Sequence, residues 1–182
     1  MIQISRDCPF YYLTSVAHER LLIFQKDIIK QIICNAWNEA RSSGQILIFA
    51  YVIMPDHVHV ITDSQRAISE VLRYLNGISA KRLLDYLKQN GFETSLGKLR
   101  QQEKLKGYKH SVWQHHPNAF RIDNETTLMQ KVHYLHQNPV RAGLVDNARD
   151  YRYSSVRMWR GEPMDEEPFI TDHQKITWRT AA

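Results

Sequence analysis

Residues 46–62, ILIFAYVIMPDHVHVIT, hold two apolar segments separated by a short Met-Pro-Asp connection. Ile46–Ile53 is a continuous apolar run, and in His57–Thr62 histidines alternate with β-branched residues. Proline presets a turn dihedral and aspartate can hydrogen-bond to its own backbone, so the stretch predicts a β-hairpin. Successive side chains of a strand point to opposite faces. We therefore expect His57 and His59 on one face of a sheet, with the valines beside them on the other.

The segments around this hairpin predict a complete order of strands and helices. Pro117 favours an edge position for the strand that contains it. Asp123 or Asn124 should cap the last helix, and Pro139 should end it. The order β-α-β-β-α-β-α is the split βαβ pattern, so we expect an α+β, ferredoxin-like fold. Its antiparallel sheet should carry helices on one face, with an added C-terminal helix. The remaining predicted elements are strands Phe10–Ala17 and Ser111–Ile122, and helices Asp27–Arg41, Arg66–Gln89 and Glu125–Asn138.

The composition is that of one folded domain with unevenly placed charge. The chain has 182 residues, 43% of them hydrophobic, and a net charge of +5. We expect a single domain over residues 1–160 and a C-terminal tail over 161–182. Between Arg66 and Lys109, ten basic residues face four acidic ones. This excess predicts a polyanion-binding surface, although a solvated helix face followed by a basic loop over Asn90–His110 would have the same composition.

The sequence carries no feature of an exported or membrane-bound protein. Cys8 and Cys34 are far apart and have no metal-like spacing, which predicts two reduced thiols. The first ten residues lack the apolar region of a signal peptide. The longest apolar run, Ile46–Met54, is too short to cross a bilayer. We therefore expect a cytoplasmic protein without a membrane partner.

The predicted helix Glu125–Asn138 has one apolar and one polar side. At about 100° per residue, Tyr134 and Asn138 lie some 40° apart, opposite the apolar stripe, and Lys131 shares their side. A tyrosine turned away from the core suits a reactive role, although a surface tyrosine would have the same pattern. The His-x-His pair is spaced to grip one cation, yet this motif also occurs in proteins that bind no metal.

Taken together, these segments resemble one protein family. Met54–His59 (MPDHVH) looks like the histidine–hydrophobe–histidine motif of HUH nucleases. Tyr134–Val145 (YLHQNPVRAGLV) closely resembles the catalytic helix and following turn of the REP-associated tyrosine transposases, relatives of single-strand insertion-sequence transposases. Val112–Gln114 and Tyr151–Ser155 also look like that group. The similarity covers about residues 8–160.

The resemblance implies a metal-dependent nuclease site. His57 and His59 match the metal-binding histidines, Tyr134 matches the nucleophile, and Asn138 matches a polar third ligand. Some relatives have glutamine as that ligand, so Gln137 is a rival. The implied cofactor is a divalent metal, Mg²⁺ or Mn²⁺. The implied reaction is cutting and rejoining of single-stranded DNA through a 5′-phosphotyrosine intermediate, beside a hairpin or palindromic repeat.

The DNA contacts and the competing functions are less defined. A non-catalytic DNA-binding module that regulates repetitive palindromic elements is the main alternative. A cupin-like metalloenzyme would need many more strands, and an RNA-binding ferredoxin-like domain would need no metal. The protein is expected to act as a monomer or as a homodimer that shares its sites. Arg141 could instead cap its helix. The residues expected to contact DNA are Lys131, Arg141, Trp113, Arg73, Lys81 and Arg82, with Tyr151, Tyr153 and Trp159 as further aromatics able to stack on bases.

Overall fold

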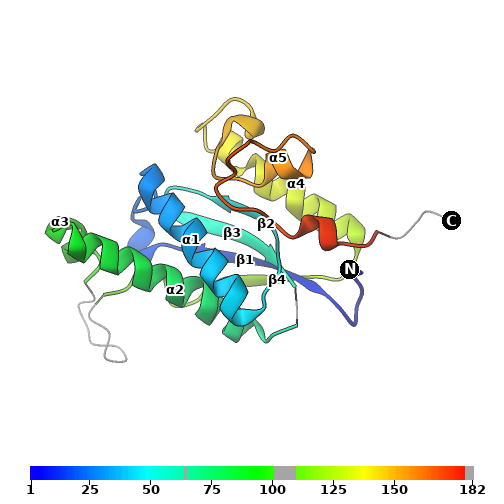
Figure 1. The fold of residues 1–182 in the computed structure, drawn as a ribbon, viewed down its shortest axis with the longest axis horizontal. Helices are drawn as coiled ribbons and strands as arrows, with labels where there is room; N and C mark the ends of the chain where they lie inside the picture. Colours follow the sequence, from blue (N-terminus) through cyan, green and yellow to red (C-terminus); the bar gives the residue numbers. More distant parts are fainter. Residues whose placement is uncertain (64, 101–109, 179–182) are drawn as a thin grey trace.

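A four-stranded antiparallel sheet forms the centre of the protein (Figure 1). The computed structural model describes residues 1–63, 65–100 and 110–178. The strand order is β2-β3-β1-β4, so the two central strands are far apart in sequence. The sheet and the helices around it confirm the α+β fold class. The strands are β1 (Phe10–Val16), β2 (Ile48–Ile53), β3 (His57–Thr62) and β4 (Asn118–Ile122).

The hairpin predicted over residues 46–62 is present. Strands β2 and β3 pair antiparallel, with Ile53 opposite Val58 and an irregularity between Ile48 and Ala50. The connection closes with a hydrogen bond from the Met54 amide to the His57 carbonyl at 2.8 Å. All six residues of β2 are buried, as expected for a continuous apolar strand.

Helices cover both faces of the sheet (Figure 1). On one face lie α1 (Asp27–Gly44) and α2 (Ile68–Gln89): Trp37 packs edge-on against Tyr51, and Asn76 donates to the Ser15 hydroxyl. On the other face lies α4 (Glu125–Arg141), whose Tyr134 ring lies near Tyr12. The fold therefore has two packed helices on one side and the added C-terminal helix on the other.

Two predicted segments differ in detail from the structure. The segment expected as a loop contains a short helix, α3 (Glu93–Lys98), because Leu96 and Leu99 reach the core. The other part of that predicted loop, residues 101–109, lies outside the described residues. The predicted strand Ser111–Ile122 is shorter, because only residues after Pro117 pair continuously with β1. As predicted, this strand is at the edge of the sheet.

The prediction that Pro139 ends α4 is wrong. Asn124 caps the start of the helix by accepting from the Thr127 amide at 2.8 Å, but the helix continues through proline to Arg141. Proline has no N–H to donate to the carbonyl four residues earlier. The Asn138 side-chain amide supplies the missing donor, since it lies 2.9 Å from the Tyr134 carbonyl and 3.3 Å from the Leu135 carbonyl.

The chain that follows α4 attaches this helix to β2. Ser154 forms an isolated bridge with Val52, and the Ile53 amide donates to the Tyr153 carbonyl at 3.0 Å. The Tyr151 hydroxyl donates to the Ile53 carbonyl at 2.7 Å. These contacts cover the outer edge of β2, which would otherwise present unpaired backbone groups. A short helix, α5 (Val156–Trp159), follows.

A buried histidine fixes α4 to the same strand. His136 is 5% exposed, and its Nε2 lies 2.8 Å from the Ser155 hydroxyl. That hydroxyl accepts a hydrogen bond from the backbone amide of Tyr51 at 2.9 Å. The position of α4 over the sheet is therefore set by hydrogen bonds to β2 as well as by apolar packing.

Residues 161–178 pack on the same core. Phe169 is 1% exposed and lies edge-on to Trp37 and Tyr51. The Asp172 amide donates to the Ile48 carbonyl at 2.7 Å. The boundary drawn at residue 160 stays a prediction. Among the described residues, no helix combines the length and the hydropathy needed to cross a bilayer.

The burial of His136 predicts that acid destabilises the protein. The pKa of His136 is lowered from 6.5 to about 3, mainly by burial and also by the charges of the nearby His133 and Arg160. Between these pH values the unfolded chain binds a proton that the folded protein does not, so stability falls as pH falls. We expect His136 to contribute up to about 1.4 kcal/mol per pH unit in this window. Urea denaturation across the window measures it.

The matched variants are His136→Gln and His115→Gln. Glutamine does not titrate, so His136→Gln should show a shallower dependence of the unfolding free energy on pH than the wild type. His115 is exposed, and its replacement should leave the slope unchanged. Equal slopes for wild type and His136→Gln would contradict this role of the buried imidazole.

Candidate functional site

The two histidines of β3 lie next to each other on the face that α4 covers. In the register with β1, His57 is opposite Val16 and His59 is opposite Thr14. The ring centroids of the two histidines are 4.8 Å apart, with an interplanar angle of 75°. His59 is 7% exposed, whereas the side chain of His57 is 19% exposed. The pair is therefore open to a ligand on the His57 side.

Each imidazole is oriented by a contact at Nδ1. Asp56 Oδ1 lies 2.5 Å from His57 Nδ1, and the Thr14 hydroxyl lies 2.9 Å from His59 Nδ1. Asp56 is itself held by Arg20, at 3.1 Å. Such contacts fix the ring plane and leave Nε2 as the nitrogen for a further ligand, the arrangement typical of metal-binding histidines.

His59 is neutral at physiological pH. Burial lowers its pKa from 6.5 to about 3, and the charge of His57 acts in the same direction. Asp56 and a side-chain hydrogen bond with Asn138 oppose this shift without cancelling it. A neutral imidazole keeps the lone pair that metal coordination needs.

Tyr134 projects from α4 toward this histidine pair. Its ring centroid is 6.4 Å from that of His59 and 6.4 Å from that of Tyr12. The residue is 43% exposed, so its hydroxyl can be reached from solvent. The guanidinium carbon of Arg141 lies 4.9 Å from the Tyr134 ring centroid. Because α4 continues past Pro139, Arg141 lies on the helix, two turns beyond Tyr134.

Lys131 and Asn138 complete the polar side of α4. The Lys131 ammonium lies 4.0 Å from the Phe120 ring centroid and 5.4 Å from that of Tyr12. The Asn138 amide nitrogen donates to the helix backbone, which leaves its oxygen for the histidine side. Asn138 also forms a side-chain hydrogen bond with His59, whereas Gln137 forms none with it among the described residues.

The predicted DNA contacts on α2 lie on the opposite face of the sheet. The Arg82 guanidinium binds both carboxylate oxygens of Glu39 at 2.9 Å, so it joins α2 to α1. Arg73 has a 72% exposed side chain that lies 3.8 Å from Glu70, and Lys81 is exposed. Of the basic residues predicted to contact DNA, only Lys131 and Arg141 are thus next to Tyr134.

The expected base-stacking role of Trp113 does not fit the structure. Trp113 is 7% exposed, its ring lies against Phe24, and its indole N–H donates to the Asn76 carbonyl at 3.1 Å. Trp113 is therefore a core residue, with little of its indole available to a base. Tyr151 and Tyr153 are also buried, while Trp159 is partly exposed.

Sequence reasoning missed two residues beside His59, Tyr12 and Thr14, and also Arg20, which contacts Asp56. Asp56 was visible as the neighbour of the motif, but its contact with His57 was not. Tyr12 and Thr14 belong to a strand more than 40 residues earlier, and only the pairing of β1 with β3 brings them to His59. The alternation of β1 would have placed them together on one face, without indicating which face.

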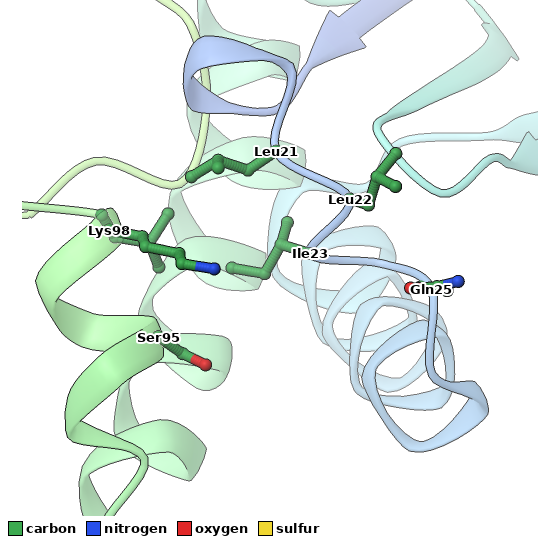
Figure 2. Close-up of a pocket in the computed structure, with 7 residues that line it drawn as sticks. Leu21, Leu22, Ile23, Gln25, Ser95 and Lys98 are labelled. Carbon is green, nitrogen blue, oxygen red and sulfur yellow. The ribbon is translucent and has the colours of Figure 1, made fainter.

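A separate apolar hollow lies between the chain after β1 and α3. Figure 2 shows this pocket of about 240 Å³, lined by Leu21, Leu22, Ile23, Gln25, Ser95, Lys98 and Leu99. Its lining contains no histidine and no carboxylate. This pocket is therefore less suited to hold a metal than the histidine pair of β3.

Comparison with known proteins identifies a family and related folds. The model of a family described as IS200-like transposases matches residues 10–138, from the start of β1 to Asn138. No curated protein matches the chain. A solved REP-associated tyrosine transposase, bound to a REP hairpin, has a TM-score of 0.61 at 17% identity, covering 95% of this chain and 91% of that one. A putative transposase from Deinococcus radiodurans has a TM-score of 0.48 at 18% identity, covering 70% and 88%.

Proposed function

We propose that this chain, which belongs to the IS200-like transposase family, cuts and rejoins single-stranded DNA through Tyr134. The observation that carries the proposal is the position of Tyr134, with its ring centroid 6.4 Å from the centroid of His59. A nucleophile and a histidine pair thus meet on one face of the sheet although they come from different elements.

The donor atoms around His59 fit a divalent cation. We propose that His57, His59 and Asn138 hold it, because two oriented imidazoles and one amide oxygen form a mixed nitrogen and oxygen set. Among the described residues, no group of three histidines, cysteines or carboxylates is arranged to hold a metal, so the amide is needed as third ligand. Bound there, Mg²⁺ or Mn²⁺ would act as a Lewis acid toward a phosphate oxygen.

Tyr134 would perform the covalent chemistry. Its phenol oxygen loses a proton and attacks the scissile phosphorus, forming a phosphotyrosine bond to the 5′ side of the break. The bond from phosphorus to the 3′ oxygen breaks, and that oxygen takes up a proton. The phosphotyrosine stores the energy of the broken bond, so a 3′ hydroxyl can reverse the step without ATP.

The substrate proposal rests on charge and access. Tyr134 is exposed, and Lys131 and Arg141 flank it, which suits a phosphate backbone passing along α4. The fold is shared with a transposase solved on a REP hairpin, so we propose single-stranded DNA next to a hairpin or palindromic repeat as substrate. Arg73 and Lys81 would contact DNA that flanks the cut, from the far side of the sheet.

The residues of the proposed site lie together within one chain. His59 and Tyr134 of the same molecule are adjacent, which supports action as a monomer. A homodimer in which Tyr134 serves a partner's histidines is the alternative.

The nucleophile can be tested by trapping the covalent intermediate. Wild-type protein, incubated with Mn²⁺ and labelled single strands next to hairpins, should form a protein–DNA adduct that resists denaturation. Tyr134→Phe should form none, because it lacks the attacking oxygen, whereas Tyr86→Phe on α2 should match the wild type. Tight binding with no adduct on any repeat-containing strand would instead favour a DNA-binding module.

The contact between Thr14 and His59 should control metal affinity. Thr14→Val removes the hydroxyl that orients the imidazole, and we expect about 10- to 100-fold weaker Mn²⁺ binding. Thr14→Ser keeps the hydroxyl and should bind Mn²⁺ almost as the wild type does. Calorimetric titration of the free protein measures both. Equal affinity of Thr14→Val and wild type would argue against a metal on His59.

The basic residues of α4 should determine the salt dependence of DNA binding. Replacing either Lys131 or Arg141 by glutamine should reduce the slope of log affinity against log salt by about one, because each removes one phosphate contact. Arg82→Gln should leave the slope unchanged, since Glu39 occupies that guanidinium. Fluorescence anisotropy over a range of salt concentrations measures the slopes. If only Arg82→Gln reduced the slope, the DNA-binding surface would lie on α2 and not on α4.

A further inference from the structure

We propose that the Tyr12 hydroxyl is a catalytic hydrogen-bond donor to the Tyr134 oxygen while that oxygen carries negative charge. The proposal rests on the proposed function, since it assigns a role in the same covalent chemistry. Tyr12 belongs to neither motif that the sequence makes visible.

Tyr12 lies between the sheet and α4, beside the reacting groups. It is opposite Ile61 in the pairing of β1 with β3, one step along the same face from the Thr14–His59 pair. Its ring centroid is 5.1 Å from the His59 centroid and 6.4 Å from the Tyr134 centroid, edge-on to the latter. The residue is 7% exposed, so protein on all sides fixes its ring.

The Tyr12 hydroxyl forms no hydrogen bond with any residue that the structure describes. Its oxygen is buried. The hydroxyls of Tyr151 and Tyr153 instead donate to backbone carbonyls, at 2.7 and 3.0 Å. A buried hydroxyl without a partner is unfavourable, which points to an acceptor that forms during the reaction.

The surroundings keep Tyr12 protonated and polarise its O–H bond. Burial raises the pKa of Tyr12, and the interaction with Tyr134 raises it further. The Lys131 ammonium lies 5.4 Å from the Tyr12 ring centroid and draws electron density toward the ring face. Tyr12 therefore keeps its proton and can act as a donor while the Tyr134 oxygen attacks phosphorus.

A donor at this place would act in both directions of the reaction. In cutting, the Tyr134 oxygen becomes negative as its proton leaves, and in rejoining it departs as a phenolate. A preorganised hydrogen bond stabilises that charge in each case. No proton leaves Tyr12, so the hydroxyl lowers the barrier without being consumed. Cutting and rejoining should therefore depend on Tyr12 to the same degree.

The test is Tyr12→Phe, which removes the oxygen and keeps the ring. Under single turnover at saturating DNA, we expect the rates of cutting and of rejoining both to fall by on the order of 100-fold. The Kd for DNA, the affinity for Mn²⁺ and the Tm should remain at wild-type values, because the lost hydroxyl binds none of these and had no partner.

Tyr51→Phe is the matched control. The Tyr51 hydroxyl is also buried and without a partner in the described residues, but its ring packs against Trp37 on the other face of the sheet. Its removal should leave both rates unchanged. A hairpin substrate with sulfur in place of the 3′ bridging oxygen distinguishes the two reacting oxygens, because sulfur leaves without help. The Tyr12→Phe defect should persist on this substrate.

The outcomes separate this proposal from the proposed function. If the wild type forms an adduct and Tyr12→Phe cuts at the same rate, the role of Tyr12 is excluded and Tyr134 stands. If the sulfur substrate restores Tyr12→Phe, the hydroxyl acts on the leaving oxygen and the assignment to Tyr134 is overturned. Equal rate losses in Tyr12→Phe and Tyr51→Phe would also overturn it. If the wild type itself forms no adduct, the proposed function fails.

Discussion

A slip of one residue in the pairing of β1 with β3 would turn every side chain of one strand to the opposite face. The observed register sets Thr14 opposite His59 and Val16 opposite His57, and so directs both imidazoles away from α1 and α2. It also brings Tyr12 to the same surface. The buried valines of β3 hold the register, because a slip would expose them and bury the histidines among apolar groups.

The second constraint is the attachment of α4 to the sheet. Hydrogen bonds from His136 through Ser155 to the backbone of β2 attach the helix at its buried side. The Asn138 amide allows the helix to pass Pro139, so Arg141 stays on the same side as Tyr134. One side chain thus completes the helix backbone and turns an oxygen toward His59. Asn138 therefore both stabilises α4 and contributes to what the polar side of this helix can bind.

A structural feature can be predicted from the sequence when residues close to it in the chain determine it. The hairpin, the cap at Asn124 and the amphipathic character of α4 follow from neighbouring residues, and the structure confirms them. The prediction that α4 ends at Pro139 was wrong, because the Asn138 side chain replaces the donor that proline lacks. The prediction that Trp113 stacks on bases was wrong, because the sequence alone does not distinguish an aromatic residue of the core from one on a binding surface. Thr14 and Tyr12 could not be found, since only the pairing of distant strands brings them to the histidines.

The contact between Asp56 and Arg20 has a consequence for how DNA would be held. The carboxylate that orients His57 is already neutralised by a guanidinium, so the surface around Tyr134 is dominated by Lys131 and Arg141. These two side chains carry positive charge beside Tyr134 whether or not a cation is bound. Under the proposed function, Lys131 and Arg141 would attract the strand, whereas a cation on the histidines would act when the strand is cut. Removal of the metal would then stop cutting and leave the strand bound.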